Sequence, residues 1–177
     1  MKSIFIGLLF IFLNFDINMG QMQIGLIPTF VGYILMLRGL NEMSAHSDWF
    51  SRAKWLATVM LVFSSFVYLM DLFGITRWLG LLGFILGVLS IVFSLLILYR
   101  IVKGVEDIEA KNGWQMFAVQ LYNRWVIMAV FSVASAVIVI IPVLALISLL
   151  VSFIALIFFL VAFNRAKNVF LNEVQNV

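Results

Sequence analysis

The polar side chains best suited to bind a ligand gather in a short stretch near the N-terminus. They are carboxamides, one carboxylate and one hydroxyl, at Asn14, Asp16, Asn18, Gln21, Gln23 and Thr29. Such side chains orient a small polar molecule through hydrogen bonds when they converge on a pocket. A hydrated loop has the same composition, because turns between apolar segments are normally polar. The sequence therefore predicts either a ligand site or a plain loop over residues 14–29.

Groups that could perform catalysis or hold a metal are sparse in the rest of the chain. It has no cysteine and one histidine, His46, which has no acidic cluster around it. Neither a metal site nor a nucleophile activated by histidine is therefore expected. Asp71 lies near the end of an apolar stretch, with Arg77 within reach as an ion-pair partner. We expect no enzyme activity, no metal and no cofactor.

The composition is that of a membrane protein. Hydrophobic residues make up 65% of the 177 residues and charged residues 11%, and the mean hydropathy is +1.19. The net charge of +3 does not indicate nucleic-acid binding, because the basic residues stand singly beside apolar segments and form no run. The lipid bilayer is the expected partner, and anionic lipid explains the basic residues better than nucleic acid does.

Six apolar stretches organise the chain into one expected integral membrane domain, residues 1–177. They cover residues 4–15, 24–40, 55–73, 78–99, 125–141 and 143–163. The last four are each close to the roughly 20 residues that a spanning helix needs. Pro142 separates the last two, because proline breaks the hydrogen-bond ladder of a helix. The predicted fold is an all-α membrane protein, a compact bundle of about six transmembrane helices.

The first hairpin is shorter than the others. Residues 4–15 would rise only about 18 Å as a helix, against a hydrocarbon core of about 30 Å. The hairpin is therefore predicted to be either a short spanning pair or re-entrant. A signal peptide is the alternative for this stretch, but no small-x-small cleavage site follows it, which favours retention.

The distribution of basic residues predicts the orientation. If the six stretches cross in turn from a cytoplasmic N-terminus, ten of the eleven basic residues fall inside and only Arg77 falls outside. Basic residues concentrate in cytoplasmic loops. We therefore expect a multi-pass protein of the bacterial inner (cell) membrane with both termini in the cytoplasm.

Three cytoplasmic segments show apolar residues at helical spacing. They are residues 114–125, residues 41–54 and the tail after Arg165, and a break is expected at Asn112-Gly113. Amphipathic helices of this kind lie in the membrane interface. We expect interfacial helices on the cytoplasmic side, which either rest on lipid or dock a partner.

Small residues recur at helical spacing within the apolar stretches. The stripes are Gly25, Gly32 and Gly39 in the second stretch, Gly80, Gly83, Gly87, Ser90 and Ser94 in the fourth, and Ala145, Ser148, Ser152 and Ala155 in the sixth. Helices approach closely along such stripes, because packing rather than the hydrophobic effect joins them in lipid. Packing within the bundle is the first expectation. A stripe that faces lipid would instead indicate a partner subunit or a homo-oligomer.

Short runs in the first quarter of the chain carry a family resemblance. The runs FDINMG at residues 15–20, IPTFVGYIL at 27–35 and RGL at 38–40 resemble the N-terminal signature of small multi-span membrane proteins of unknown function from Gram-positive bacteria. In size and helix number the chain is also similar to S components of energy-coupling-factor vitamin transporters. That resemblance implies substrate binding from outside through an early loop, and it assigns no binding residue in this chain.

Two functions remain open from the sequence. The first is a non-catalytic membrane interaction protein, such as a subunit of a larger complex. The alternative is a substrate-binding or channel-forming component of a small-molecule transporter, with an outward-facing site near residues 14–29. An outward-opening cavity would favour the alternative.

Overall fold

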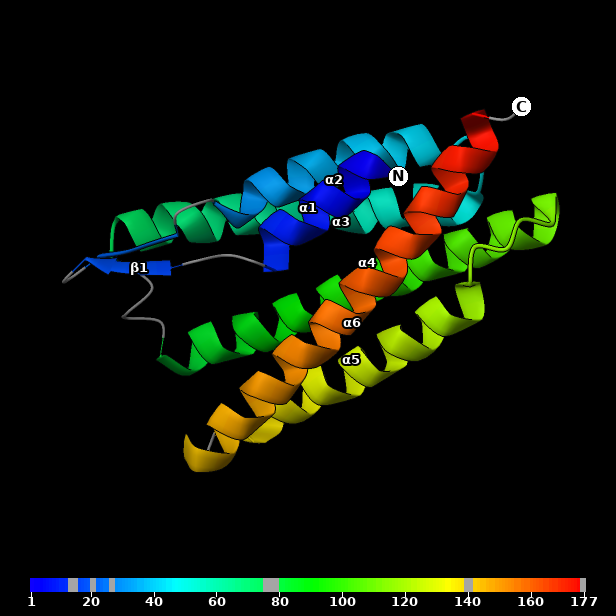
Figure 1. Ribbon diagram of the computed structural model, residues 1–177. Coiled ribbons are helices and arrows are strands. Elements are labelled where there is room, and N and C mark those ends of the chain that lie inside the picture. The colour runs from blue at the N-terminus through cyan, green and yellow to red at the C-terminus, as the bar shows by residue number, and fades with distance from the viewer. Residues whose placement is uncertain (13–15, 20–21, 26–27, 75–79, 139–141, 176–177) are drawn as a thin grey trace.

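The computed structural model describes residues 1–12, 16–19, 22–25, 28–74, 80–138 and 142–175, which form six helices and one pair of short strands (Figure 1). The elements follow in the order α1 (Lys2–Phe12), β1 (Asp16–Met19), β2 (Met22–Gly25), α2 (Thr29–Met43), α3 (Asp48–Leu72), α4 (Gly80–Asn112), α5 (Ala118–Ile138) and α6 (Pro142–Gln175). Consecutive helices pack together, and α1 also contacts α6. Both chain termini lie at one end of the bundle, which we call the terminal end, and the strands lie at the other, the hairpin end.

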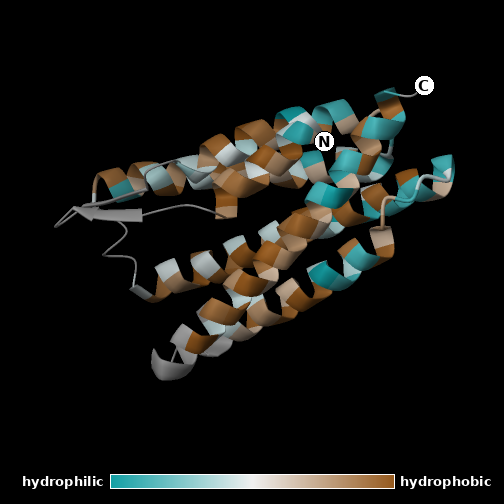
Figure 2. Ribbon diagram, viewed as in Figure 1, coloured by the Kyte–Doolittle hydropathy of each residue, from teal (hydrophilic) through white to brown (hydrophobic). Residues whose placement is uncertain are grey.

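Three of the described helices are long and apolar enough to cross a membrane. They are α3, α4 and the part of α6 from Leu150 to Gln175. With 33 residues α4 is about 50 Å long, so it exceeds the hydrocarbon core. Polar residues gather at the terminal end, whereas apolar residues dominate the rest of the bundle (Figure 2). The chain is therefore a helical membrane protein, as the composition predicts.

The second apolar stretch is divided between a strand and a helix. The sequence predicts one stretch over residues 24–40, but residues up to Gly25 belong to β2 and α2 begins only at Thr29. The physical reason is Pro28, which has no backbone N–H and disfavours a helical residue before it. Gly25 therefore does not lie on the helix that carries Gly32 and Gly39, and the predicted stripe of three glycines is wrong at this position.

The segments predicted as interfacial helices do not form helices of their own. Residues 41–54 are shared between the end of α2, a turn and the start of α3, for which Ser47 is the N-cap. The tail after Arg165 continues α6 without a break, because no glycine or proline interrupts the hydrogen-bond ladder there. Residues 114–117 are a connection, and α5 runs from Ala118 into the apolar stretch.

In the connection between α4 and α5, a glycine ends the first helix and a carboxylate caps the start of the second. Helix α4 ends at Asn112, and Gly113 adopts a positive φ of 70°, so the break predicted at Asn112-Gly113 is confirmed. The carboxylate of Glu109 accepts a hydrogen bond of 3.0 Å from the backbone N–H of Ala118. This acceptor supplies a partner for one of the free donors at the start of α5.

Glycines bring α1 and α2 unusually close together. A Cβ atom added to Gly7 would lie 2.6 Å from the carbonyl oxygen of Gly32 and 2.7 Å from the nitrogen of Met36. One added to Gly39 would lie 2.6 Å from the nitrogen of Ile4. No larger residue fits at these positions without moving a backbone. Gly32 and Gly39 thus lie at a contact within the chain, through the close approach that small residues permit in lipid.

The apolar core lies in the half of the bundle toward the terminal end. Every helix supplies fully or nearly fully buried side chains there: Ile4, Leu8, Met36, Leu40, Phe50, Met60, Ile97, Ile101, Leu121, Phe159 and Phe163. Helix α1, with 11 residues, is only about 16 Å long and ends inside the bundle. Toward the hairpin end α3 and α4 run apart (Figure 1). The short α1 therefore packs against α2 and α6 in one half of the bundle only.

Candidate functional site

The side chains on the inward face of α4 become smaller and more polar from the terminal end toward the hairpin end. Ile97, Ile101 and Val105 are fully buried and continue, at helical spacing, a face that includes Ser94 and Gly87. Toward the hairpin end this face therefore carries small and hydroxylated side chains in place of large apolar ones. The opposite face of the same segment exposes large apolar residues, among them Leu82, Ile85, Leu89, Val92 and Leu96.

Helix α3 shows the same change. Its buried face includes Phe50, Ala57 and Met60, and the following positions at helical spacing are Ser64, Tyr68 and Asp71. All three are partly buried. The opposite face is apolar and open, as illustrated by Phe66, which is 61% exposed. Polar residues in membrane helices normally face the bundle interior or a water-filled cavity. The arrangement on α3 and α4 fits that rule.

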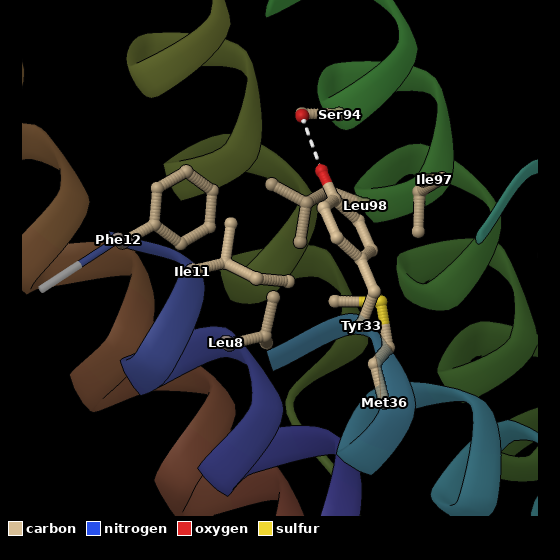
Figure 3. A pocket seen from close by; sticks show the side chains of 8 residues that line it. All are labelled: Leu8, Ile11, Phe12, Tyr33, Met36, Ser94, Ile97 and Leu98. Atoms are coloured by element: carbon tan, nitrogen blue, oxygen red, sulfur yellow. Dashed lines mark hydrogen bonds between the residues drawn. The ribbon is translucent and has the colours of Figure 1, made fainter. Parts of the chain in front are cut away.

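A part-buried hydrogen bond joins α2 to α4 beside these polar faces. The hydroxyl groups of Tyr33 on α2 and Ser94 on α4 lie 3.1 Å apart, and Tyr33 is only 2% exposed (Figure 3). A small cavity of about 10 Å³ adjoins them, which is close to the space that one water requires. Its apolar wall includes Leu8, Ile11 and Phe12 of α1. The bond thus joins α2 to α4 beside the end of α1.

A second, larger cavity lies on the other side of the end of α1. It has a volume of about 220 Å³ and is lined by Phe12, Met128, Ser132, Ser152, Phe153 and Leu156. The hydroxyl of Ser135 lies 2.7 Å from that of Ser152 and donates to the carbonyl oxygen of Ser148 at 3.1 Å. Ser148 and Ser152 therefore join α6 to α5, and the hydroxyl groups of Ser132 and Ser152 border the cavity. We call these two spaces the α1-end cavities, since both contact Phe12.

Gly87 differs from the glycines of α1 and α2. A Cβ atom added there would meet no atom of the described residues within 4 Å. Gly83, one turn away on the same helix, is partly buried. The small face of α4 thus borders open space toward the hairpin end, on the side of the helix that carries Ser94.

The predicted polar cluster lies at the hairpin end, but the structure describes only part of it. Asp16 pairs with Gly25 and Asn18 with Gln23 in the antiparallel β1–β2 ladder, and β2 contacts α3. Thr29 is the first residue of α2. Asn14 and Gln21 lie outside the described residues, as does Arg77, the expected partner of Asp71.

Sequence analysis did not identify Tyr33 or Ser132 as residues that border the α1-end cavities. The signal available was the extension of each buried helix face toward the hairpin end, where large residues give way to small and polar ones. Within the described part of the chain, no three His, Cys, Asp or Glu side chains form a group that could hold a metal ion.

The apolar helices and their polar inner faces define the class as helical membrane proteins with a partly polar interior. No protein-family model matches the chain, and no curated protein or solved structure matches it significantly. The functional argument therefore rests on the geometry of this chain alone.

Proposed function

We propose that this chain is a non-catalytic multi-pass membrane protein that binds a small polar molecule in the interior beyond the end of α1, entering from the outer side. A substrate-binding component of a small-molecule transporter is the corresponding role. The observation that carries the proposal is a change along the inward faces of α3 and α4. Both faces are apolar at the terminal end, and toward the hairpin end the face of α3 becomes polar and that of α4 becomes small and hydroxylated.

The orientation follows from charge. In the proposed topology all six helices belong to a bundle whose terminal end faces the cytoplasm of a bacterial cell. Polar residues gather at the terminal end (Figure 2). Arg52 lies near the start of α3, and Arg100 and Lys103 lie in the later part of α4; basic residues favour the cytoplasmic side. The hairpin end then faces outward, and the space beyond α1 opens toward the outside.

The length of α1 supplies the physical reason for an interior space. Its helix ends at Phe12, well short of the roughly 30 Å of the hydrocarbon core. Beyond Phe12, the next described residues form β1 and β2 and not a continuation of that helix. Hydroxyl groups from α2, α4, α5 and α6 border the α1-end cavities, and such groups bind polar molecules or water.

The other function predicted from the sequence, a partner subunit docked on a small-residue stripe, receives less support. Ser152 on α6 is partly buried and bonded to Ser135 of α5, and Gly87 lies on the helix face of α4 that carries the partly buried Gly83 and Ser94. A partner in the membrane would meet the apolar faces instead, and lipid covers such faces equally well.

Cysteine accessibility tests the proposal directly, because the natural chain has no cysteine. Ser90→Cys and Gly87→Cys place a thiol on the inward face of α4, and Leu89→Cys and Val92→Cys place one on its apolar face as matched controls. A membrane-impermeant, charged methanethiosulfonate added from outside should modify the inward thiols at least tenfold faster. Equal rates on the two faces would show that the interior is closed to water and would refute the proposal.

Retention of the natural ligand is the second measurement. The protein purified in mild detergent should release a small molecule detected by native mass spectrometry. Gly87→Trp fills the open space beside α4 and should abolish that signal while leaving the helix content unchanged. A wild-type protein with no bound small molecule beyond that of Gly87→Trp would contradict a binding role.

A further inference from the structure

A chain of aromatic rings links α3, α4 and α5 near the terminal end. The ring centroids of Trp49 and Tyr99 lie 6.4 Å apart, those of Tyr99 and Trp125 5.1 Å, and those of Trp125 and Tyr122 5.8 Å. The indole N–H of Trp125 donates to the backbone oxygen of Leu95 at 3.2 Å. Tryptophan and tyrosine favour the level of the lipid headgroups. These rings therefore mark the cytoplasmic interface in the proposed orientation.

Two arginines meet beside these rings. The guanidinium carbon of Arg52 lies 5.2 Å from the centroid of Trp49, and Nη1 of Arg100 donates to the backbone oxygen of Arg52 at 2.6 Å. The junction of α3 and α4 thus holds two permanent positive charges. One turn further along α4, Lys103 is already bound to Glu106 at 2.7 Å.

No carboxylate among the described residues neutralises either arginine. The ion pairs of this part of the chain join Arg38 to Glu42, Lys103 to Glu106 and Lys111 to Asp107. Asp48 lies one turn before Arg52 on α3 but forms no ion pair with it. Two neighbouring cations that have no carboxylate partner are stabilised strongly when an anion binds between them. Guanidinium groups bind phosphate in particular, through paired hydrogen bonds.

An apolar groove begins directly below Arg52 on the same face of α3. Arg52, Trp55, Val59, Val62 and Phe66 follow one another at steps of three or four residues, so they form one stripe. The groove is an open hollow on the surface of α3, lined by Trp55, Thr58, Val59, Val62, Phe63 and Phe66, all residues of that helix. Trp55 is 67% exposed. A flexible hydrocarbon chain that descends from a headgroup at Arg52 would lie along this groove.

We infer that the junction of α3 and α4 is a binding site for one anionic diacyl phospholipid, such as phosphatidylglycerol. Its phosphate interacts with the guanidinium groups of Arg52 and Arg100, its glycerol region contacts Trp49 and Tyr99, and one acyl chain lies in the groove on α3. Charge complementarity selects this lipid, since a zwitterionic headgroup brings a cation of its own toward two unneutralised arginines. The inference stands independently of the proposed small-molecule site.

Native mass spectrometry of the purified protein titrated with phosphatidylglycerol or phosphatidylcholine tests the site. Wild type should bind the first phosphatidylglycerol at least fivefold more tightly than phosphatidylcholine. Arg52→Gln, which leaves the Arg100 hydrogen bond to the backbone in place, and Arg52→Gln with Arg100→Gln should both abolish that preference. Arg38→Gln and Arg124→Gln are matched controls, because both remove an exposed arginine elsewhere on the chain, and they should change the affinity less than twofold.

A charge-preserving variant separates a lipid site from simple attraction to anions. Val62→Trp fills the groove without altering the arginines and should weaken phosphatidylglycerol binding at least threefold. Glycerol 1-phosphate, the headgroup chemistry without acyl chains, should not displace the lipid at millimolar concentration. An equal loss of affinity in the Arg38→Gln control, no loss in Val62→Trp, or displacement by glycerol 1-phosphate would each overturn the inference.

Discussion

The close contact of α1 with α2 predicts that a single methyl group added at Gly39 lowers the stability of the protein. In Gly39→Ala the new Cβ atom would lie 2.6 Å from the nitrogen of Ile4, whereas ordinary contact begins near 3.4 Å. Because the obstacle is backbone, α1 must move away from α2 by about 0.8 Å, which a closely packed interior resists. In Gly87→Ala the same methyl group enters open space beside the described residues.

The magnitude follows from comparing the two variants. Alanine favours a helix over glycine by about 1 kcal/mol, and this gain is common to both positions. Overpacking at a tight contact costs about 1–3 kcal/mol. The free energy of unfolding of Gly39→Ala should therefore fall below that of Gly87→Ala by about 1–3 kcal/mol, with Gly87→Ala at or slightly above wild type.

Unfolding in mixed micelles with increasing fractions of SDS measures this difference. Tryptophan fluorescence reports the transition, since the chain has five tryptophans, and circular dichroism checks that both variants start from the same helix content. A Gly39→Ala protein that unfolds at the same SDS fraction as Gly87→Ala, or later, would refute the glycine contact between α1 and α2.

Two further predictions concern hydrogen bonds that hold helices in place. A double-mutant cycle with Tyr33→Phe and Ser94→Ala in the same SDS assay should give a coupling energy of about 0.6 kcal/mol, the average for such bonds in membranes, and at most about 1.7 kcal/mol; additive effects would show that the two hydroxyls are not bonded. Glu109→Gln should lower the free energy of unfolding by about 1 kcal/mol, because the amide oxygen is a weaker acceptor for the N–H of Ala118 at the start of α5. Glu106→Gln, which removes only an exposed ion pair with Lys103, is the control, with an expected loss below about 0.5 kcal/mol; equal losses would contradict the capping role.

Helix boundaries were predictable where proline or glycine acts locally. Helix α6 begins at Pro142, and α4 ends at Asn112 just before Gly113, which has a positive φ. Both boundaries lie where proline and glycine are expected to break a helix. The start of α2 was not predicted, because apolar composition over residues 24–28 concealed the effect of Pro28. The predicted interfacial helix over residues 114–125 failed for a tertiary reason. Its end belongs to α5, and the carboxylate that accepts the first N–H of that helix comes from α4.

The candidate site depended on tertiary structure more than the helices did. Periodicity alone placed Gly32 and Gly39 on one helix face, but it could not indicate that Gly7 of α1 lies against them. The hydroxyls of Tyr33 and Ser94 are 61 positions apart in the chain, and only the packing of α2 against α4 brings them together. The polar cluster near residues 14–29 was conspicuous in the sequence, and its role as a ligand site stays a prediction.

The sequence by itself determined that this chain is a helical membrane protein and that helices break at Gly113 and Pro142. Hydropathy suffices for the first point, because lipid and water act on each segment separately, and local backbone geometry suffices for the second. Only the tertiary structure decided that α1 ends inside the bundle, which faces of α3 and α4 meet, and that Arg52 and Arg100 share one junction. Those features depend on contacts between segments distant in sequence, and no local pattern encodes them.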